Sequence, residues 1–288
     1  MMGFGGTVSN AEMPTKAYPI LEIMMSSRYV NMYSSQDAPK VPPAPLNVYG
    51  WKQAADNIAE LAKQLGCKTI VLGGHDWGGP VVYRTCLWHP TLVSHVFSVC
   101  TPYKPSAEQF VPLPTLVAGL VPQFGYQLQF AGQDVEAAVQ SEGDIRRLLS
   151  AIYGGPTPDG ECIFDPRKGV DIAKLPSVGE APLLKGEDLD YYTREFSRNG
   201  VRGGLNWYRT YQANWEDEVG LEKKTIDIPC LFVLASRDTV LTKDLSEGME
   251  DFIPLLTRKE IDAGHFVLVE KPHEVNIALQ EWLEQYGI

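Results

Sequence analysis

Asp76 occupies the middle of a short segment whose composition suits a nucleophile. An apolar run, residues 69–73, leads into the hexapeptide Gly74-His75-Asp76-Trp77-Gly78-Gly79, and an expected helix follows from Pro80 to about His89. Small residues on both sides of the central position leave room for a sharp, strained strand-to-helix turn. A carboxylate at the tip of such a turn can attack carbon and form an ester. A glycine-rich loop with a capping Asp is the alternative interpretation of the hexapeptide alone.

Asp238 and His265 supply an acid and a base downstream, in the order that a nucleophile of this kind requires. Asp238 follows the buried-strand run 231–235, and His265 follows a second strand-like segment. Side chains at the carboxyl ends of parallel strands meet in the crevice where open α/β sheets bind ligands. Each residue alone is more often a turn former or a packed side chain, but the ordered set indicates a catalytic triad.

The surrounding pattern alternates helices and strands, as expected of an α/β fold. An amphipathic helix is predicted over residues 51–65 with Gly66 as its C-terminal cap, and a strand over residues 94–100. Further helices are predicted near residues 243–252 and from Pro272 onward, where proline suits a first turn. The candidate nucleophile therefore lies between a strand and a helix of one α/β core.

Together with two tyrosine motifs, these segments resemble the α/β-hydrolases, and specifically the epoxide hydrolases of microbes and fungi. The motifs are Ala151-Ile152-Tyr153-Gly154-Gly155 and Gly204-Leu205-Asn206-Trp207-Tyr208-Arg209. The similarity extends from about Val41 to the C-terminus. It implies an α/β-hydrolase fold, with a mostly parallel sheet that lacks its N-terminal strands and a mainly helical lid inserted between core strands.

The resemblance implies a two-step hydrolysis of an epoxide. Asp76 attacks a ring carbon, while Tyr153 and Tyr208 donate hydrogen bonds to the ring oxygen; a phenol pKa of about 10 suits that role. His265 then activates water against the ester, and Asp238 orients the imidazole. No metal or organic cofactor is needed, and the expected partners are a small apolar epoxide and water.

The same resemblance implies oxyanion- and substrate-binding roles for three neighbours of these residues, namely His75, Trp77 and Trp207. The backbone N–H of Trp77 is expected in the oxyanion hole. The second donor of the family comes from a His-Gly-x-Pro loop, and this sequence contains no such motif. Loss of one oxyanion donor costs about 3 kcal/mol of transition-state stabilisation, so a slow hydrolytic step is expected.

Three parts are predicted along the chain. Residues 1–103 form the N-terminal part of the core, residues 104–222 the lid, and residues 223–288 the C-terminal part of the core. Residues 9–36 have neither helical nor strand period, and are predicted to be an atypical insert from a translated intron or a gene-model error. On this interpretation the chain starts just after the fourth strand of the family's sheet, and the central strand has an uncovered edge.

Composition limits the partners and the compartment. The 288 residues carry a net charge of −11 without a Lys/Arg cluster, which disfavours nucleic acid as a partner. Five scattered cysteines show neither metal-ligand spacing nor a disulfide rhythm, which favours a reducing, cytoplasmic compartment. No apolar run approaches the roughly 20 residues of a membrane span, and no secretory signal pattern is present. The sequence leaves the oligomeric state open.

Two other functions compete with epoxide hydrolysis. A haloalkane dehalogenase also uses an elbow Asp followed by Trp, but it binds halide with nitrogen donors and has no use for a tyrosine pair. A catalytically inactive fragment or binding protein is favoured by the missing His-Gly-x-Pro motif. A serine esterase is disfavoured because Asp76 stands at the nucleophile position.

Overall fold

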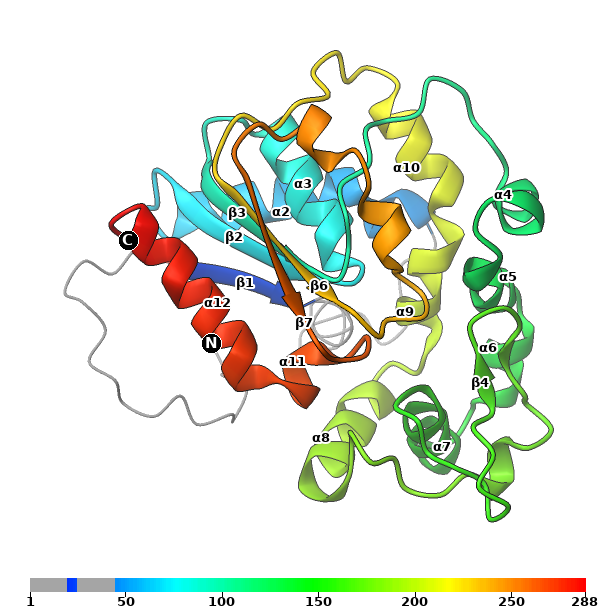
Figure 1. Cartoon of the computed structure of the whole chain (residues 1–288). Helices are drawn as coiled ribbons and strands as arrows, with labels where there is room; N and C mark the ends of the chain where they lie inside the picture. Colours follow the sequence, from blue (N-terminus) through cyan, green and yellow to red (C-terminus); the bar gives the residue numbers. More distant parts are fainter. Residues whose placement is uncertain (1–19, 25–44) are drawn as a thin grey trace.

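A five-stranded sheet forms the centre of the computed structural model, which describes residues 20–24 and 45–288, with side chains from residue 45 onward. Every neighbouring pair of strands is parallel, in the order β1-β2-β3-β6-β7 (Figure 1). The strands are β1 Ile20–Met24, β2 Ile70–His75, β3 Val93–Val99, β6 Cys230–Ala235 and β7 Leu256–Ile261. The predicted α/β class with a mostly parallel sheet is confirmed.

Strand β1 corrects the expectation for the N-terminal region. It lies inside segment 9–36, where the sequence pattern predicts no strand, yet it pairs with β2 from Ile20 opposite Val71 to Met24 opposite His75. Its sequence, Ile-Leu-Glu-Ile-Met, is apolar enough for a strand beside a buried neighbour. The edge of β2 that was expected to be uncovered is therefore paired, which satisfies its backbone groups. The remainder of segment 9–36 lies outside the described residues.

Helices cover both faces of the sheet (Figure 1). The long ones are α2 Trp51–Gln64, α3 Gly78–Trp88 and α12 Pro272–Gln285. Leu72 and Phe232 point from the sheet into the cluster formed with α2 and α3. Their neighbours Val71 and Leu231 point to the opposite face and join the cluster that contains α12. This alternation follows from the two-residue period of a strand buried on both faces.

Helix α2 matches its predicted limits, and its predicted buried face is confirmed at Ala55, Ile58 and Ala62 but not at Leu61 and Leu65. Gly66, just beyond the helix, adopts the left-handed conformation expected of a terminating glycine, with φ +71°. The apolar spacing places Leu61 and Leu65 on the buried side, whereas both are exposed in the structure. The helix buries Ala54, Ala55, Ile58 and Ala62. Small side chains there allow α2 to pack closely against α3.

Residues 104–222 break the strand–helix alternation, as predicted, and are mainly helical. They lie beyond the carboxyl ends of the sheet strands (Figure 1). Their elements are α4 Leu113–Gly119, η2 Pro122–Phe124, α5 Gly125–Ala131, α6 Asp134–Ala138, α7 Glu142–Ile152, β4 Phe164–Asp165, β5 Gly169–Val170, η3 Leu175–Ser177, α8 Gly186–Ser197, α9 Arg202–Asn206, η4 Trp207–Arg209 and α10 Tyr211–Glu218. The exact division of the chain at residues 103 and 222 stays a prediction.

The helix predicted near residues 243–252 is absent from the structure. Two short 3₁₀ helices replace it, η5 Lys243–Ser246 and η6 Met249–Asp251. Gly248 between them adopts the left-handed conformation, with φ +75°, which interrupts a right-handed helix. The remaining elements are the 3₁₀ helix η1 Leu46–Tyr49, before α2, and helix α11 Val267–Glu270, after β7.

The helices of residues 45–288 are all too short or too polar to cross a lipid bilayer.

Candidate active site

Asp76 lies on a sharp turn between β2 and α3, with its backbone in the left-handed region at φ +52°. A Cβ atom on Gly74 would lie 2.3 Å from the carbonyl oxygen of Gly78, so this turn has no room for a side chain there. The N–H of Gly79 and the hydroxyl of Thr101 donate to the Asp76 carbonyl, at 2.9 and 2.7 Å. The main chain is thereby fixed, and the Asp76 side chain lines an apolar cavity.

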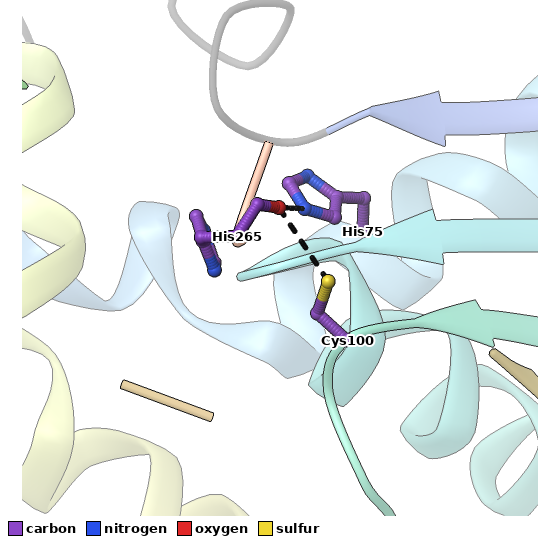
Figure 2. Close-up of side chains that lie close together, drawn as sticks. All are labelled: His75, Cys100 and His265. Atoms are coloured by element: carbon purple, nitrogen blue, oxygen red, sulfur yellow. Dashed lines mark hydrogen bonds between the residues drawn. The ribbon is translucent and has the colours of Figure 1, made fainter. Parts of the chain in front are cut away.

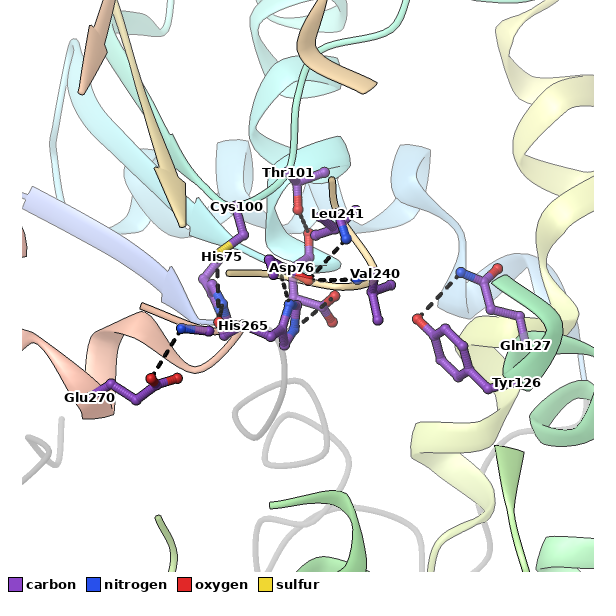
Figure 3. Close-up of polar contacts among 12 residues, drawn as sticks. His75, Asp76, Cys100, Thr101, Tyr126, Gln127, Val240, Leu241, His265 and Glu270 are labelled. Carbon is purple, nitrogen blue, oxygen red and sulfur yellow. Dashed lines mark hydrogen bonds and ion pairs between the residues drawn. The ribbon is translucent and has the colours of Figure 1, made fainter. Parts of the chain in front are cut away.

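His265 follows β7 and lies between two carboxylates. Its Nδ1 is 2.7 Å from Oδ2 of Asp238, and its Nε2 is 3.5 Å from Oδ1 of Asp76 (Figure 3). The other Asp238 oxygen accepts the N–H groups of Val240 and Leu241, at 2.8 and 3.0 Å. The structure therefore brings the three predicted residues into one chain of contacts, with Asp238 buried behind the imidazole.

The pKa values of His265 and Asp238 are shifted in the direction that general-base chemistry needs. Burial opposes the charged form of His265, but the hydrogen bond that its ring donates to Asp238 and the negative charges of Asp76, Asp238 and Glu270 outweigh burial, so the pKa of His265 is raised. Burial alone would raise the pKa of Asp238, because it disfavours the charged carboxylate. The hydrogen bonds that Asp238 accepts from His265 and from two backbone N–H groups outweigh burial, so the pKa of Asp238 is lowered. His265 is therefore a stronger base than an ordinary histidine, and Asp238 stays ionised.

His75, predicted to bind substrate or oxyanion, lies behind His265 and does not line the cavity. Its Nε2 donates to the His265 carbonyl at 2.8 Å, and the thiol of Cys100 donates to the same oxygen at 3.5 Å (Figure 2). Burial, and then the positive charge of His265, lower the pKa of His75 to about 4, so this ring is neutral at neutral pH. We assign His75 to holding the main chain that carries His265.

The ligand atoms of His75, Cys100 and His265 lie within 4.8 Å of one another, a spacing compatible with a metal ion. The chemistry of the set argues against that use. His75 and Cys100 both donate a hydrogen bond to the His265 carbonyl oxygen. Burial also raises the pKa of the Cys100 thiol well above its usual range, so the thiolate that a metal needs is disfavoured. Nδ1 of the third residue is held by Asp238. These three residues therefore form a hydrogen-bonded support for the His265 turn.

A cavity of about 410 Å³ lies between the sheet and segment 104–222, and it is mainly apolar. Among the described residues that line it, Asp76 and His265 are the ones with ionisable acid or imidazole groups, and none is Lys or Arg. The lining residues are Asp76, Trp77, Tyr126, Phe130, Ile145, Leu148, Leu149, Ala151, Ile152, Tyr153, Gly154, Cys162, Phe164, Pro166, Tyr192, Phe196, Val201, Gly204, Leu205, Trp207, Tyr208, Thr239, Val240, His265 and Phe266. The cavity suits a neutral, largely apolar molecule.

Tyr208, one of the two predicted tyrosines, is held above the nucleophile turn by edge-on aromatic contacts. Its ring centroid lies 5.3 Å from that of Trp77 and 5.0 Å from that of Phe130. Burial, and then the negative charge of Asp76, raise the pKa of its phenol. Arg209 next to it donates to the carbonyl oxygens of Ala131 and Gly132. Those bonds fasten η4 to the end of α5 and fix the position of the tyrosine.

Tyr126 on α5 is a site residue that the sequence analysis missed. Its ring lies 5.8 Å from that of Tyr208, and its hydroxyl points toward the side of the cavity where Asp76 and His265 lie (Figure 3). Burial, then the neighbouring Tyr208 and the charge of Asp76, raise the pKa of this phenol well above its usual range. The spacing of Tyr126 and Phe130, one helical turn apart, is the sequence signal that could have revealed an aromatic face here.

Tyr153, the other predicted tyrosine, also lines the cavity but faces a different neighbour. Its ring stacks on that of Phe266, with centroids 4.1 Å apart and an interplanar angle of 17°. The Phe266 ring also contacts the His265 imidazole edge-on, with centroids 5.2 Å apart, so Tyr153 lies on the far side of Phe266's contacts with that imidazole. The described contacts therefore pair Tyr208 with Tyr126 more closely than with Tyr153.

Trp77 and Trp207 both line the cavity, as expected of substrate-contacting residues. Their ring centroids are 6.4 Å apart. Trp77 follows the nucleophile in sequence, so its backbone N–H lies at the start of α3, where the helix dipole favours negative charge. Together the two indoles form part of the cavity wall.

This chain is similar to known α/β-hydrolases in sequence and in structure. The model described as "Alpha/beta hydrolase family" matches residues 34–278, which include every candidate site residue named above. Epoxide hydrolase srdG of Neurospora crassa is 37% identical over 266 residues, which cover 88% of this chain and 76% of that protein. Epoxide hydrolase A of Mycobacterium tuberculosis is 32% identical over 249 residues, with 84% and 77% covered. The crystal structure of epoxide hydrolase A from Mycobacterium thermoresistibile matches with a TM-score of 0.70 at 31% identity, covering 84% of this chain and 77% of that one.

Proposed function

Because the chain belongs to the alpha/beta hydrolase family and, within it, to the epoxide hydrolases, we propose that it converts an apolar epoxide to a vicinal diol through an ester on Asp76. The observation that carries the proposal is the contact chain from Asp76 through His265 to Asp238, opposite two phenols in an apolar cavity. A carboxylate nucleophile, a base and neutral acids are the groups that this reaction requires.

In the first step an oxygen of the Asp76 carboxylate attacks the less hindered ring carbon, and the ring C–O bond breaks. The ring oxygen takes a proton from a phenol, which leaves a hydroxyalkyl ester on Asp76 and a tyrosinate. We assign the acids to Tyr126 and Tyr208, because both are influenced by the charge of Asp76 and their rings meet. This replaces the expected partner Tyr153, whose described ring contact is the stack on Phe266.

In the second step His265 takes a proton from water as the water oxygen attacks the ester carbonyl. The tetrahedral intermediate collapses, and the departing diol oxygen takes the proton back from His265. Asp76 is released as a carboxylic acid, and its proton restores the tyrosinate. Asp238 holds the imidazole in the required tautomer, and the N–H of Trp77 supports the oxyanion. Neither step needs a metal or an organic cofactor.

Hydration of a small aryl epoxide by the purified chain, run beside Asp76→Asn, tests the proposed reaction. Asn keeps the shape of the side chain but removes the nucleophilic carboxylate. Diol formation that vanishes in the variant is the expected result. A folded parent chain that forms no diol would contradict the proposed function and would favour a protein that binds ligands in this cavity without turning them over.

Haloalkane dehalogenation is the second candidate, favoured by the two indoles of Trp77 and Trp207 in the cavity wall. Indole N–H groups can stabilise a departing halide, whereas the paired phenols serve an epoxide oxygen. Release of halide from a short bromoalkane measures this activity. A halide rate that exceeds the epoxide rate would reverse the assignment.

We further propose that residues 104–222 act as a lid that closes the substrate cavity, and that the protein works in a reducing, cytoplasmic compartment. Residues from this segment line most of the cavity wall, which supports the first point. All five cysteines are free, which is compatible with the second.

A further inference from the structure

The turn that carries His265 is held from three separate elements. His75 at the end of β2 and Cys100 after β3 both donate to the His265 carbonyl. From the opposite side, the N–H of Gly264 donates to the carboxylate of Glu270 at 3.0 Å (Figure 3). The side chains of His75 and Cys100 are neutral at neutral pH, whereas Glu270 brings a negative charge to the turn that carries His265.

Glu270 is the last residue of α11, and its carboxylate lies against the turn. A Cβ atom on Gly264 would lie 2.9 Å from Oε1 of Glu270, so the two segments are in close contact. The side chain is 18% exposed, and Nη2 of Arg237 lies 3.7 Å from its second oxygen. Arg237 itself pairs with Asp262 at 2.9 Å. Glu270 is therefore shared between a surface guanidinium and the turn before His265.

We propose that Glu270 is a positioning residue for His265 in the ester-hydrolysing step. Its carboxylate holds the Gly264 turn, and its charge stabilises the imidazolium that forms when His265 takes a proton from water. This inference rests on the proposed ester mechanism and goes beyond it, because Glu270 touches neither the substrate nor the reacting atoms.

The two steps of the reaction differ in how much they depend on Glu270. During ester formation, Asp76 and Asp238 both carry negative charge beside His265. Once the ester has formed, Asp76 is neutral, and Asp238 and Glu270 remain as the carboxylates that support the imidazolium, while the tyrosinate left by the first step lies on the phenol side of the cavity. Among the described residues, the ionisable groups that face this turn come from five places. They are Asp76 and His75 of the β2 end, Cys100 of the β3 end, Asp238 of the β6 end, Glu270 of α11, and Arg237 with its partner Asp262 behind Glu270.

Two variants separate the charge of Glu270 from its hydrogen bond. Glu270→Gln keeps an oxygen that can accept from Gly264 but removes the charge, and Glu270→Ala removes both. Glu274→Gln is the matched control, because Glu274 is an exposed residue at the start of α12 that pairs with Lys271, at 3.3 Å, and has no contact with the turn. Tryptophan fluorescence, to which Trp77 and Trp207 contribute from the cavity wall, reports ester formation and decay in single-turnover experiments.

In Glu270→Gln, ester decay is expected to slow by about threefold to tenfold, the size of effect expected for one partly exposed charge. The midpoint of its pH profile should move to lower pH, while the rate of ester formation stays at the parent value. Glu270→Ala should slow decay at least as much, and Glu274→Gln should leave both steps unchanged.

Unchanged ester decay and an unchanged midpoint in both Glu270 variants would overturn the inference. Equal slowing of both steps without a shifted midpoint would also overturn it, because that pattern reports general loosening of the turn. A parent chain in which intact-mass measurement detects no ester on Asp76 would instead refute the proposed function itself, which keeps the two failures distinct.

Discussion

At the scale of single residues, the proton chemistry depends on the base strength of His265. Its ring is held at Nδ1 by Asp238 and lies 3.5 Å from Asp76, so anions surround it on two sides. Burial opposes the imidazolium, and these charges outweigh burial. The neutral ring of His75 behind it adds no competing positive charge at neutral pH.

The pKa of His265 in the resting protein is expected above the ordinary value of about 6.5. The neutral ring is the form that accepts a proton, so ester decay should rise as the pH increases through the pKa that His265 has in the ester, which lies below the resting value because Asp76 is then uncharged. Asp76→Asn removes a negative charge and should lower the pKa of His265. Titration of the histidine ring signals by NMR measures both values, and equal pKa values in the parent and the variant would contradict the assigned contact.

Replacement of the phenols tests which tyrosines act as acids. Tyr126→Phe and Tyr208→Phe should each slow ester formation by about 10²-fold, because general-acid catalysis is worth at least that much. Tyr153→Phe keeps the ring that stacks on Phe266 and is expected to form the ester at nearly the parent rate. Single-turnover fluorescence compares the three, and a larger effect at Tyr153 than at Tyr126 would restore the pair predicted from sequence.

The difference between Tyr126 and Tyr153 shows what sequence reasoning could reach at this scale. Asp76, Asp238 and His265 were predictable because each follows a strand, and parallel strands bring their carboxyl ends together. The tyrosines lie on separate helices of segment 104–222, and their approach to Asp76 depends on how those helices pack. Only the fold reveals that the edge contact of Tyr208 is made with Tyr126.

At the scale of elements, a buried ion pair joins the core to segment 104–222. Nε of Arg84 on α3 lies 2.6 Å from Oε1 of Glu218 on α10, and both side chains are at most 7% exposed. Arg84 also donates to the carbonyl oxygen of Lys104, at 3.0 Å. The two ends of the segment, near residues 104 and 218, are therefore fastened to one helix that begins beside the nucleophile.

Glu218→Gln should lower the free energy of unfolding by about 3 kcal/mol, because it leaves the Arg84 charge buried and unpaired. Asp227→Asn is the control, since Asp227 pairs with Lys223 at the surface, with both side chains more than half exposed, and such pairs contribute about 0–1 kcal/mol. Urea denaturation followed by circular dichroism measures the difference. Equal losses in the two variants would show that the buried pair has no special role.

Element predictions succeeded where a periodic pattern was long and failed where a short segment depended on its surroundings. The strand before Asp76 and helices α2 and α12 follow from apolar spacing and from Gly66 and Pro272. Strand β1 has five residues, and its pairing depends on the free edge of β2. The predicted helix over residues 243–252 failed because Gly248 adopts a left-handed backbone, which sequence spacing does not report.

At the scale of the whole molecule, two features act on the charge of a substrate. The cavity wall is mainly apolar, and the protein as a whole carries a net charge of −11. None of the cavity's described lining residues is Lys or Arg, so a carboxylate on a substrate would be buried without a partner. The long-range field of an acidic protein repels the same anion before it binds. Substrate choice is thus expected to depend on charge as well as on shape.

An epoxide that bears a terminal carboxylate should react with a kcat/KM at least about tenfold below that of its methyl ester, given the cost of burying an unpaired charge. The two compounds share one chain length and one epoxide, so the comparison isolates charge. Steady-state diol formation measures both. Equal values would mean that the carboxylate stays in water or meets a cation outside the described lining.

The proposed ester mechanism requires that the second oxygen of the diol comes from Asp76. A single turnover with excess protein in water enriched in ¹⁸O tests this directly, with mass spectrometry of the diol and of the peptide that contains Asp76. We predict an unlabelled diol and an ¹⁸O atom in the Asp76 carboxylate, because water attacks the ester carbonyl. A labelled diol with an unlabelled Asp76 would show direct attack of water on the epoxide and would rule out an ester on Asp76.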